Sequence, residues 1–563
     1  MAEEAKHSGH PASEQGFIDF RTEPNQYCHW QLSIEEHIAW LGLSVDEHAT
    51  LASGYELKLN SYDLSVDIEL ADAIARIRFE HPEVRCVVVH SLNDRVFCAG
   101  ANIKMLGLSS HAHKVNFCKF TNETRNAMEE AEDAGLTFLA AIKGSCAGGG
   151  YELALACSEI ILADDGSSAV SLPELPLLAV LPGTGGLTRL VDKRMVRRDR
   201  ADFFCTTEEG IRGQRAVDWR LVDEIVPASK FDERVRARAE AITADNPREV
   251  DGGVALPPLK RELTEHSIAY DYLSVEINRA LSVATFNLQG PAVEPPANIG
   301  EVVNAGANYW YFAMLRALDD AILHLRFNEP EIGTWCFQSA GDLDRVLAYD
   351  AQLLAHRDHW FADEVMRLAK RVLKRIDVSA RSLIAAIEPA SCFGGTLFEL
   401  VLAADQSFML LGQFEDDEAP PAAIALSAMN FGPLPMVSGI SRLQARYMGE
   451  EATATELKSR LGTSIDAESA DQLGLVSFIP DDIDWEDEIR IVLEARSGFS
   501  PDALTGMEAS LRFPGPETLE SKIFSRLSAW QNWIFQRPNA VGDDGALVLY
   551  GTGQRPKYDK RRA

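Results

Sequence analysis

The sequence lacks several features that would assign it to common protein classes. It has no C-x-x-C pair, and its nine cysteines are scattered and odd in number. This favours reduced thiols over a disulfide framework or a structural zinc site. No apolar run approaches the ~18 residues that a membrane-spanning helix needs. The first residues, MAEEAKHSGHPASEQ, contain no apolar signal core. We therefore expect a cytoplasmic protein without a metal centre.

Positive charge is also scarce, because the formal net charge is -31. Nucleic acids and anionic membranes bind cationic surfaces, so neither is an expected partner. The net charge does not exclude a local basic patch that binds a phosphorylated small molecule.

The 563 residues, 46% hydrophobic and 25% charged, have a globular composition and are too many for one ordinary domain. An internal repeat divides them. LADAIARIRFEHPE (70–83) recurs as LDDAILHLRFNEPE (318–331), and each copy reads as an amphipathic helix stopped by proline. Each is followed by an apolar run that predicts a buried strand, CVVVHS (86–91) and TWCFQS (334–339).

A second match follows in the same order. AAIKGSCAGGGYELALA (140–156) is similar to AAIEPASCFGGTLFELVLA (385–403). Chance could explain one such segment, but two at nearly the same offset indicate a duplication.

The predicted organisation has five parts, and strand–helix alternation within each copy predicts an α/β fold. The parts are an N-terminal extension (1–50), a catalytic first copy (51–260), a linker or helical segment (261–300), a degenerate second copy (301–480) and a C-terminal segment (481–563) that ends in a solvated tail, KYDKRRA.

Three segments of the first copy suggest chemistry. In RVFCAGANIKML (95–106), a strand ends in a small-residue turn and a helix is expected near Asn102. Such a turn can aim a backbone N–H at a ligand oxygen, although most Ala-Gly turns are only turns.

The second segment is GSCAGGGYELALA (144–156), in which three glycines precede an apolar helix. Free N–H groups at a helix start can bind a developing oxyanion. Glu152 lies in the first turn, where it is either a site residue or simply a Glu favoured by the helix dipole.

The third segment is SLPELPLLAVLPGTGGLTRL (171–190). Glu174 lies between two prolines in apolar surroundings, which raise the pKa of a carboxyl and suit it to proton transfer. The alternative is an exposed loop Glu. PGTGG predicts another turn into a helix.

Together, and with KLNSYDL (58–64) upstream, these segments resemble the crotonase (enoyl-CoA hydratase/isomerase) superfamily. The resemblance implies a spiral of ββα units, duplicated here. It implies that the N–H groups of Ala101 and Gly149, which follow Gly100 and Gly148, hold a thioester oxygen, and that Glu152 and Glu174 form the acid/base pair.

Two further residues are suggested by the same resemblance. Lys104 matches a position near the CoA nucleotide, with a solvated lysine as the alternative. Cys118, in VNFCKFTNETR, lies where relatives cover the acyl pocket, with a buried structural cysteine as the alternative.

The second copy departs from this pattern. AGDLDRVL follows its strand in place of the CAGAN loop, GSCAGGGYE becomes ASCFGGTLFE, and GQFEDDEAPPAAIAL has no clear PE-x match. We expect this copy to be catalytically inactive and to serve as a packing partner.

The whole chain, including NWIFQRPNAVGDDGALVLYGTGQRPKYDKR near its end, resembles the benzoyl-CoA-dihydrodiol lyases. That resemblance implies ring opening of 2,3-epoxybenzoyl-CoA to 3,4-didehydroadipyl-CoA semialdehyde and formate. It implies an acyl-CoA substrate, no separate cofactor and a homo-oligomer, dimer or trimer. An enoyl-CoA hydratase or isomerase, and a non-catalytic acyl-CoA-binding scaffold, are the alternatives. Which glutamate is the acid stays open.

Overall fold

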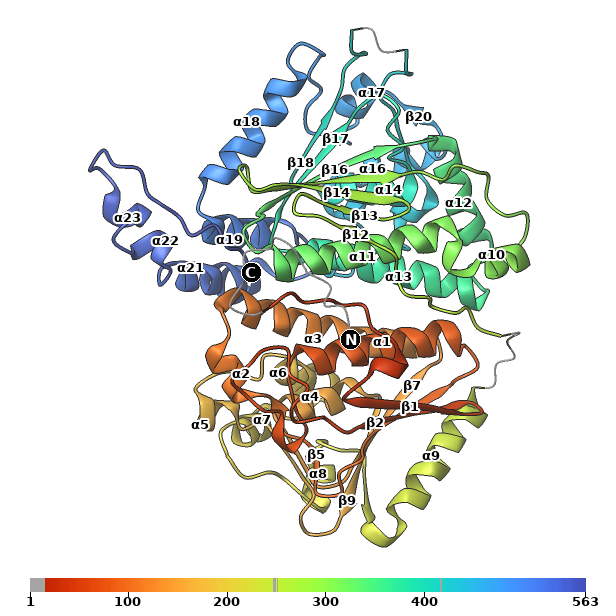
Figure 1. The fold of residues 1–563 in the computed structure, drawn as a ribbon, viewed down its shortest axis with the longest axis vertical. Helices are drawn as coiled ribbons and strands as arrows, with labels where there is room; N and C mark the ends of the chain where they lie inside the picture. Colours follow the sequence, from red (N-terminus) through yellow and green to blue (C-terminus); the bar gives the residue numbers. More distant parts are fainter. Residues whose placement is uncertain (1–15, 247–249, 251, 416–417) are drawn as a thin grey trace, which may run out of the picture. The chain divides into compact units, whose positions relative to one another are not determined.

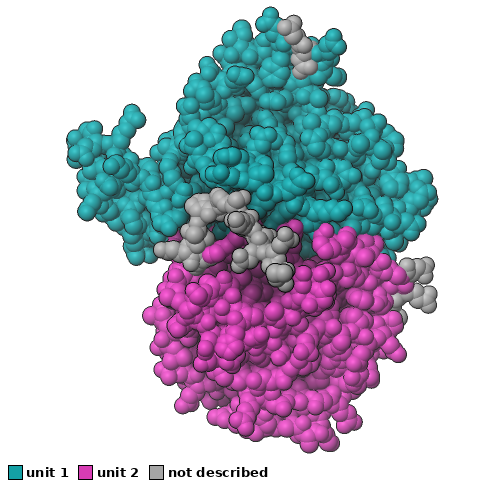
Figure 2. Space-filling view, in the orientation of Figure 1, with its two compact units in different colours: residues 1–11, 259–563 teal, residues 12–258 magenta. Residues whose placement is uncertain are grey.

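The computed structural model describes residues 16–246, 250, 252–415 and 418–563. The chain divides into two compact units, which meet in the sequence between Pro258 and Leu259 (Figure 2). We call them the N-terminal unit (magenta in Figure 2) and the C-terminal unit (teal).

The N-terminal unit is built on a six-stranded sheet of order β1-β2-β4-β7-β9-β11 (Figure 1). The first two strands form an antiparallel hairpin and every other pair is parallel. The strands are β1 (Trp30–Glu35), β2 (Ile38–Leu43), β4 (Cys86–Ser91), β7 (Thr137–Ile142), β9 (Glu159–Asp164) and β11 (Glu224–Pro227).

Shorter strands form a second layer. A parallel ladder of order β10-β8-β5 joins β5 (Val96–Cys98), β8 (Ser145–Ala147) and β10 (Ala169–Ser171). A two-stranded ladder joins β3 (Ser61–Tyr62) to β6 (Gly100–Ala101). Each turn of the chain therefore adds one strand to the large sheet, one to the small sheet and then helix, which is the predicted spiral of ββα units.

The helices of this unit follow the predicted segments. Asp63 caps the first of them by accepting a hydrogen bond from the Ser65 N–H, and Pro82 follows its end. The helices are α1 (Leu64–Glu80), α2 (Ile103–Leu108), α3 (His111–Glu132), α4 (Gly149–Ala156), α5 (Glu174–Leu178), α6 (Gly186–Thr188), α7 (Arg198–Cys205), α8 (Gln214–Asp218) and α9 (Phe231–Asp245).

The sheet is buried because it is covered by helices. The central strand β4 carries Cys86 and three consecutive valines that are fully buried, as expected of a parallel strand packed on both faces. Phe231, Val235 and Ile242 of α9 pack against Val88 and other core residues of β4, β7 and β9. The predicted strand CVVVHS is confirmed.

The C-terminal unit repeats the topology of the large sheet and adds two antiparallel strands, β12 and β13, to its edge. Its sheet has the order β12-β13-β14-β15-β16-β17-β18, with parallel pairs from β15 onward. The strands are β12 (Glu262–Leu263), β13 (Ser267–Ala269), β14 (Leu273–Asn278), β15 (Val283–Gln289), β16 (Thr334–Ala340), β17 (Ser382–Ile387) and β18 (Gln406–Met409), and a separate ladder pairs β19 (Ile424–Ala425) with β20 (Ser464–Ile465).

Helices recur at corresponding places, so that α11 matches α1 and α14 matches α4. The helices of this unit are α10 (Ile299–Ala305), α11 (Trp310–Asn328), α12 (Leu343–Ala355), α13 (Trp360–Asp377), α14 (Gly395–Ala403), α15 (Arg442–Arg446), α16 (Glu451–Leu457), α17 (Ala467–Gln472), α18 (Trp485–Gly498), α19 (Pro501–Leu511), α20 (Leu519–Ser521), α21 (Ser528–Ile534), α22 (Pro538–Val541) and α23 (Ala546–Leu549).

One hydrogen bond marks where each copy begins. The Tyr27 hydroxyl donates to Asp72 of α1 at 2.5 Å, and the Tyr270 hydroxyl donates to Asp320 of α11 at 2.6 Å. Each tyrosine lies three residues before an antiparallel hairpin, β1-β2 or β14-β15. The duplication therefore includes these hairpins.

Two predicted boundaries are consequently wrong. Residues 1–50 were expected to be an extension, but β1 and β2 are strands of the large sheet, and residues 1–15 lie outside the described residues. Residues 261–300 were expected to be a linker or helical segment, but they contain β12 to β15. The proline-rich stretch that follows β15 leads from this sheet to a helix, α10 (Ile299–Ala305).

The C-terminal segment 481–563 is helical, and most of its last residues, KYDKRRA, are exposed as expected, although Arg562 anchors them. Arg562 is buried and forms an ion pair with Glu508 at 2.5 Å. None of the helices in the described ranges is long and apolar enough to cross a membrane.

Candidate active site

The loop after β5 brings a backbone N–H to the small sheet. Ala101 pairs with Tyr62 in a parallel ladder, and the Asn102 N–H donates to the Tyr62 carbonyl at 2.8 Å. In a parallel ladder, one residue of each pair bonds to the two neighbours of the other residue. Here Tyr62 bonds to a neighbour of Ala101, so the Ala101 N–H itself points away from β3. Asn102 then caps α2 by accepting from the Met105 N–H at 2.9 Å.

Gly100 allows this loop to touch the start of α4. Its φ is +85°, and an ideal Cβ placed there would lie 2.6 Å from the nitrogen of Gly149. Gly149 is the first residue of α4, so its N–H has no acceptor within the helix. Gly148 before it has a φ of +54°. The predicted oxyanion donors, Ala101 and Gly149, therefore belong to two segments in direct contact.

Glu152 is buried and rigidly held. Its Oε1 accepts from the backbone N–H groups of Thr184 at 2.9 Å and Gly186 at 2.8 Å. Its Oε2 accepts from the Thr184 hydroxyl. The carboxylate of Glu152 thus has a fixed orientation, set by the turn that precedes α6.

Sequence reasoning missed the residues that hold Glu152. Within PGTGG, it predicted only a turn. The turn is fixed by Arg189, which donates to the Thr184 carbonyl at 3.0 Å and pairs with Glu129 of α3 at 2.9 Å. The signal that could have revealed this was the arginine four residues after the second glycine of PGTGG.

Glu174 begins α5 and has a different environment. Burial raises its pKa to about 7, and the charge of Glu152 contributes to the increase. Its Oε2 is buried with no hydrogen-bond partner, and its Oε1 would lie 2.9 Å from an ideal Cβ at Gly148. Glu174 is therefore near the start of α4, and it titrates near neutral pH.

Cys118 and Lys104 lie in different settings. The sulfur of Cys118, on α3, would lie 3.5 Å from an ideal Cβ at Gly183. Burial raises the pKa of this thiol to about 11, and the charge of Glu152 adds to the effect. Cys118 is therefore a protonated thiol near the PGTGG turn. Lys104 is exposed on α2.

A buried charge network stands behind the start of α4. Arg125 of α3 pairs with Asp67 of α1 at 3.2 Å and donates to the Tyr62 hydroxyl at 3.5 Å. That hydroxyl would lie 1.9 Å from an ideal Cβ at Gly149. Only glycine fits at position 149, because Tyr62 fills the space of a side chain.

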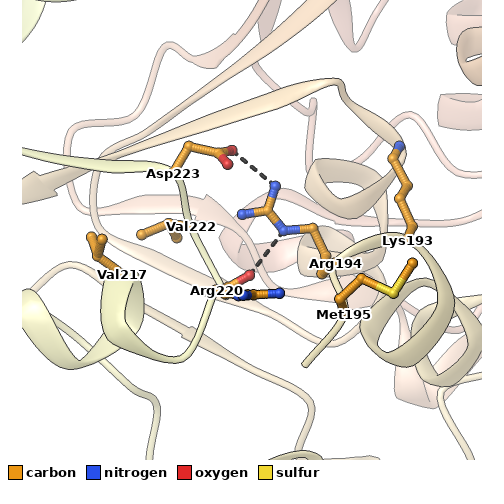
Figure 3. Close-up of a pocket in the computed structure, with 7 residues that line it drawn as sticks. All are labelled: Lys193, Arg194, Met195, Val217, Arg220, Val222 and Asp223. Carbon is orange, nitrogen blue, oxygen red and sulfur yellow. Dashed lines mark hydrogen bonds and ion pairs between the residues drawn. The ribbon is translucent and has the colours of Figure 1, made fainter. Parts of the chain in front are cut away.

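A cavity of about 410 Å³ lies elsewhere in this unit (Figure 3). It contains none of the predicted site residues. Lys193 on its rim donates to the carbonyls of Ala156 and Cys157 at the far end of α4, and Arg194 pairs with Asp223 at 2.9 Å. The lining residues are Lys193, Arg194, Met195, Val217, Arg220, Val222 and Asp223.

The matching position in the C-terminal unit is closed by ion pairs. Glu399 of α14 is fully buried, pairs with Arg442 at 3.0 Å and accepts from the Asn430 amide at 2.8 Å. Arg442 also binds Asp377 at 2.8 Å. Glu399 is thus a structural carboxylate.

Comparisons with known proteins agree with this arrangement. The family model described as enoyl-CoA hydratase/isomerase matches residues 56–253. The chain is 54% identical over 548 residues to the benzoyl-CoA-dihydrodiol lyase of Aromatoleum evansii, covering 97% of this chain and 98% of that protein.

Other relatives match a shorter part of the chain. The fatty acid oxidation complex subunit alpha of Vibrio cholerae is 30% identical over 201 residues, which is 36% of this chain and 26% of that protein. A solved enoyl-CoA hydratase from Bacillus anthracis is 28% identical, covers 38% of this chain and 77% of its own, and has a TM-score of 0.34.

Proposed function

The chain belongs to the benzoyl-CoA-dihydrodiol lyase family, within the crotonase superfamily, and on this basis we propose that it opens the ring of 2,3-epoxybenzoyl-CoA. The proposed products are 3,4-didehydroadipyl-CoA semialdehyde and formate. Atom balance requires two molecules of water, because the ring loses one carbon as formate and both products carry added oxygen or hydrogen.

The thioester carbonyl is the proposed electron sink. When a ring C–C bond breaks, electrons move toward the thioester and negative charge grows on its oxygen. The N–H groups of Ala101 and Gly149 would bind that oxygen, and one such donor is typically worth about 3–4 kcal/mol. Since the thioester accepts the electrons, this scheme requires no metal or redox cofactor.

The two carboxyl groups have separate proposed roles. Glu174 has a pKa of about 7 and an unpartnered oxygen, so it can give and take protons at neutral pH. We assign to it the proton transfers to the opened oxygen. Glu152 is held by Thr184 and Gly186, and we assign to it the orientation of the attacking water.

The remaining positions have supporting roles. Cys118, as a protonated thiol, would contact the ring without acting as a nucleophile. Lys104 is an exposed cation that could meet a CoA phosphate, and Gly100 and Gly148 give the backbone its close approach to the thioester.

The assembly and location of the protein are also proposals. We propose a cytoplasmic homo-oligomer, a dimer or trimer, that binds neither nucleic acid nor membranes. Exposed apolar side chains along the last helices, including Leu519, Phe524 and Tyr550, support self-association. Light scattering coupled to gel filtration would test it, and a monomer at micromolar concentration would contradict it.

One observation carries the catalytic proposal: a single unit combines two backbone donors with a rigid carboxylate and a titrating one. The test is to incubate the protein with 2,3-epoxybenzoyl-CoA and to measure formate. We expect formate in equal amount to substrate consumed. Absence of formate together with rapid hydration of crotonyl-CoA would favour a hydratase, and binding of both thioesters without turnover would favour a scaffold.

Side-chain variants test the acid/base assignment. Glu152→Gln and Glu174→Gln should each lower kcat by about 10²–10⁴-fold with little change in thioester affinity. Glu132→Gln changes an exposed glutamate on α3 and is the matched control. Full activity in both site variants would refute the assignment.

A further inference from the structure

The two copies of the site can be aligned through α4 and α14. Glu152 and Glu399 occupy corresponding positions, which aligns Gly148 with Gly395 and Gly149 with Thr396. The backbone agrees, because φ is +54° at Gly148 and +47° at Gly395. The N–H of Thr396 is thus the counterpart of the oxyanion donor in the N-terminal unit.

The segment that follows also recurs. LPGTGGLTRL (181–190) matches LPMVSGISRL (434–443), so Arg189 corresponds to Arg442. Ser427 lies beside Gly395 as Glu174 lies beside Gly148, since ideal Cβ atoms at these glycines would approach them at 2.6 and 2.9 Å. The framework of the site is therefore retained in the C-terminal unit.

The difference lies in what occupies the anion position. In the C-terminal unit the Thr396 N–H donates to Oδ2 of Asp350, on α12, at 2.9 Å. The Thr396 hydroxyl donates to Oδ1 at 2.8 Å, and the Ser427 hydroxyl donates to Oδ2 at 2.6 Å. An ideal Cβ at Gly395 would lie 1.8 Å from Oδ2.

Asp350 is completely buried, and burial of a carboxyl is costly unless donors surround it. Here the donors are the N–H of Thr396 at a helix start and the hydroxyls of Thr396 and Ser427. A thioester oxygen needs the same N–H, and the carboxylate already fills that position. Glu399, the counterpart of Glu152, is meanwhile bound by Arg442 and Asn430.

We propose that the C-terminal unit contains a second anion site of the oxyanion type, which the protein fills with the carboxylate of its own Asp350. This unit therefore binds no CoA thioester, and it accepts a small free carboxylate, such as formate or acetate, when the side chain of Asp350 is removed. The inference rests on the contacts of Asp350 and not on the proposed ring-opening reaction.

The first experiment measures thermal unfolding of the full chain in sodium formate, sodium acetate and sodium chloride at equal ionic strength. In Asp350→Ala, formate should raise the unfolding temperature by ~2 °C or more above chloride, in a saturable manner. The wild type and Asp350→Asn, whose side chain still fills the site, should show no such difference. A folded Asp350→Ala without a carboxylate-specific increase would overturn the proposal, as would an equal increase in the wild type.

A second measurement decides the question if Asp350→Ala does not fold. Calorimetric titration of the wild-type chain with benzoyl-CoA should give one site per chain. Two sites per chain would overturn the proposal. If Asp350→Ala does not fold, Asp350→Ser, which shortens the side chain but keeps a polar group, replaces it in the carboxylate experiment. The expected and contradicting outcomes are the same. Loss of benzoyl-CoA binding altogether would count against the proposed function, while the carboxylate experiment would still decide the inference.

Discussion

At the scale of single residues, the two glutamates of the proposed site have different chemical environments. Glu152 lies on a helix that packs under the PGTGG turn, where it receives three hydrogen bonds. Glu174 lies on a short helix with one oxygen buried and unpartnered. A buried carboxyl with an unpartnered oxygen favours its neutral form, which explains why burial raises the pKa of Glu174 to about 7.

The pH dependence of catalysis should report Glu174. With its pKa at about 7, kcat/KM of the free enzyme should change slope near that pH. In Glu174→Gln this inflection should vanish along with most of the activity, whereas Glu132→Gln should retain it. Steady-state rates between pH 5.5 and 9 would check this; an unchanged inflection in Glu174→Gln would assign it to another group.

The same group should affect stability. Because the pKa of Glu174 is raised from 4.5 in the unfolded chain to about 7 in the folded one, the folded state holds the proton more tightly. Its contribution to the free energy of unfolding is therefore greatest below about pH 4.5 and falls as the pH rises to about 7. Urea unfolding of the wild type and Glu174→Gln should diverge across this window, with the variant relatively more stable at pH 8. Parallel curves would contradict the raised pKa.

At the scale of elements, the site depends on how closely three turns approach one another. Gly100, Gly148 and Gly149 are required for different reasons: positive φ at the first two, and the neighbouring Tyr62 hydroxyl at the third. The sequence showed that these glycines mark turns. It did not show that the turn of residues 99–101 contacts the start of α4.

Gly100→Ala, compared with a control glycine, tests whether the contact between Gly100 and Gly149 is needed for catalysis. A methyl group there would lie 2.6 Å from the nitrogen of Gly149, so the oxyanion donor must move. We expect a loss of kcat of about 10²-fold or more. Gly166→Ala is the matched control, because φ is +77° and no atom lies within 4 Å of the added methyl.

Both variants should lose about 1–2 kcal/mol of stability from the left-handed backbone conformation. Only Gly100→Ala should lose activity beyond what that destabilisation explains. Equal kcat in the two variants, measured well below their unfolding temperatures, would show that the contact with Gly149 is unimportant.

The repeat was predictable from α1 and α4 but not from the hairpins. The helical segments share identical residues between the two copies, whereas β1-β2 and β14-β15 share little beyond alternation of apolar residues. Their equivalence is visible only in the sheet order and in the Tyr27–Asp72 and Tyr270–Asp320 hydrogen bonds. β1 and β2 pair locally with each other, but their place in the large sheet depends on the pairing of β2 with β4, which joins residues far apart in sequence. That pairing leaves no local pattern, which is why residues 30–43 were assigned to an extension.

At the scale of the whole molecule, the two units share one arrangement of helix start and carboxyl groups but differ in what occupies it. In the N-terminal unit, the helix start carries Gly149, the proposed oxyanion donor. The C-terminal unit fills the equivalent position with Asp350 and joins Glu399, Arg442 and Asp377 by buried ion pairs. We therefore propose that the C-terminal unit has a structural role and takes no part in the reaction.

Breaking the buried ion pairs should therefore destabilise the protein without removing catalysis. Arg442→Met leaves two buried carboxyl groups without a cation, which typically costs about 3–5 kcal/mol. The exposed Arg490, changed to Met, should cost less than about 1 kcal/mol. Unfolding by urea would measure both, and kcat of folded Arg442→Met should stay within about two-fold of wild type. A large loss of kcat would tie the C-terminal unit to the reaction.

The sequence by itself determined the duplication, the α/β class, the three glycine-rich turns and the two glutamates of the first copy. These features depend on the local order and spacing of residues, so they can be recognised in the sequence. Only the tertiary structure decided that Glu152 is bound by Thr184 and Gly186, that Glu174 has a buried oxygen without a hydrogen-bond partner, and that Asp350 fills the second anion position. Burial, charge and hydrogen bonding depend on groups brought together from distant parts of the chain, so no local pattern records them.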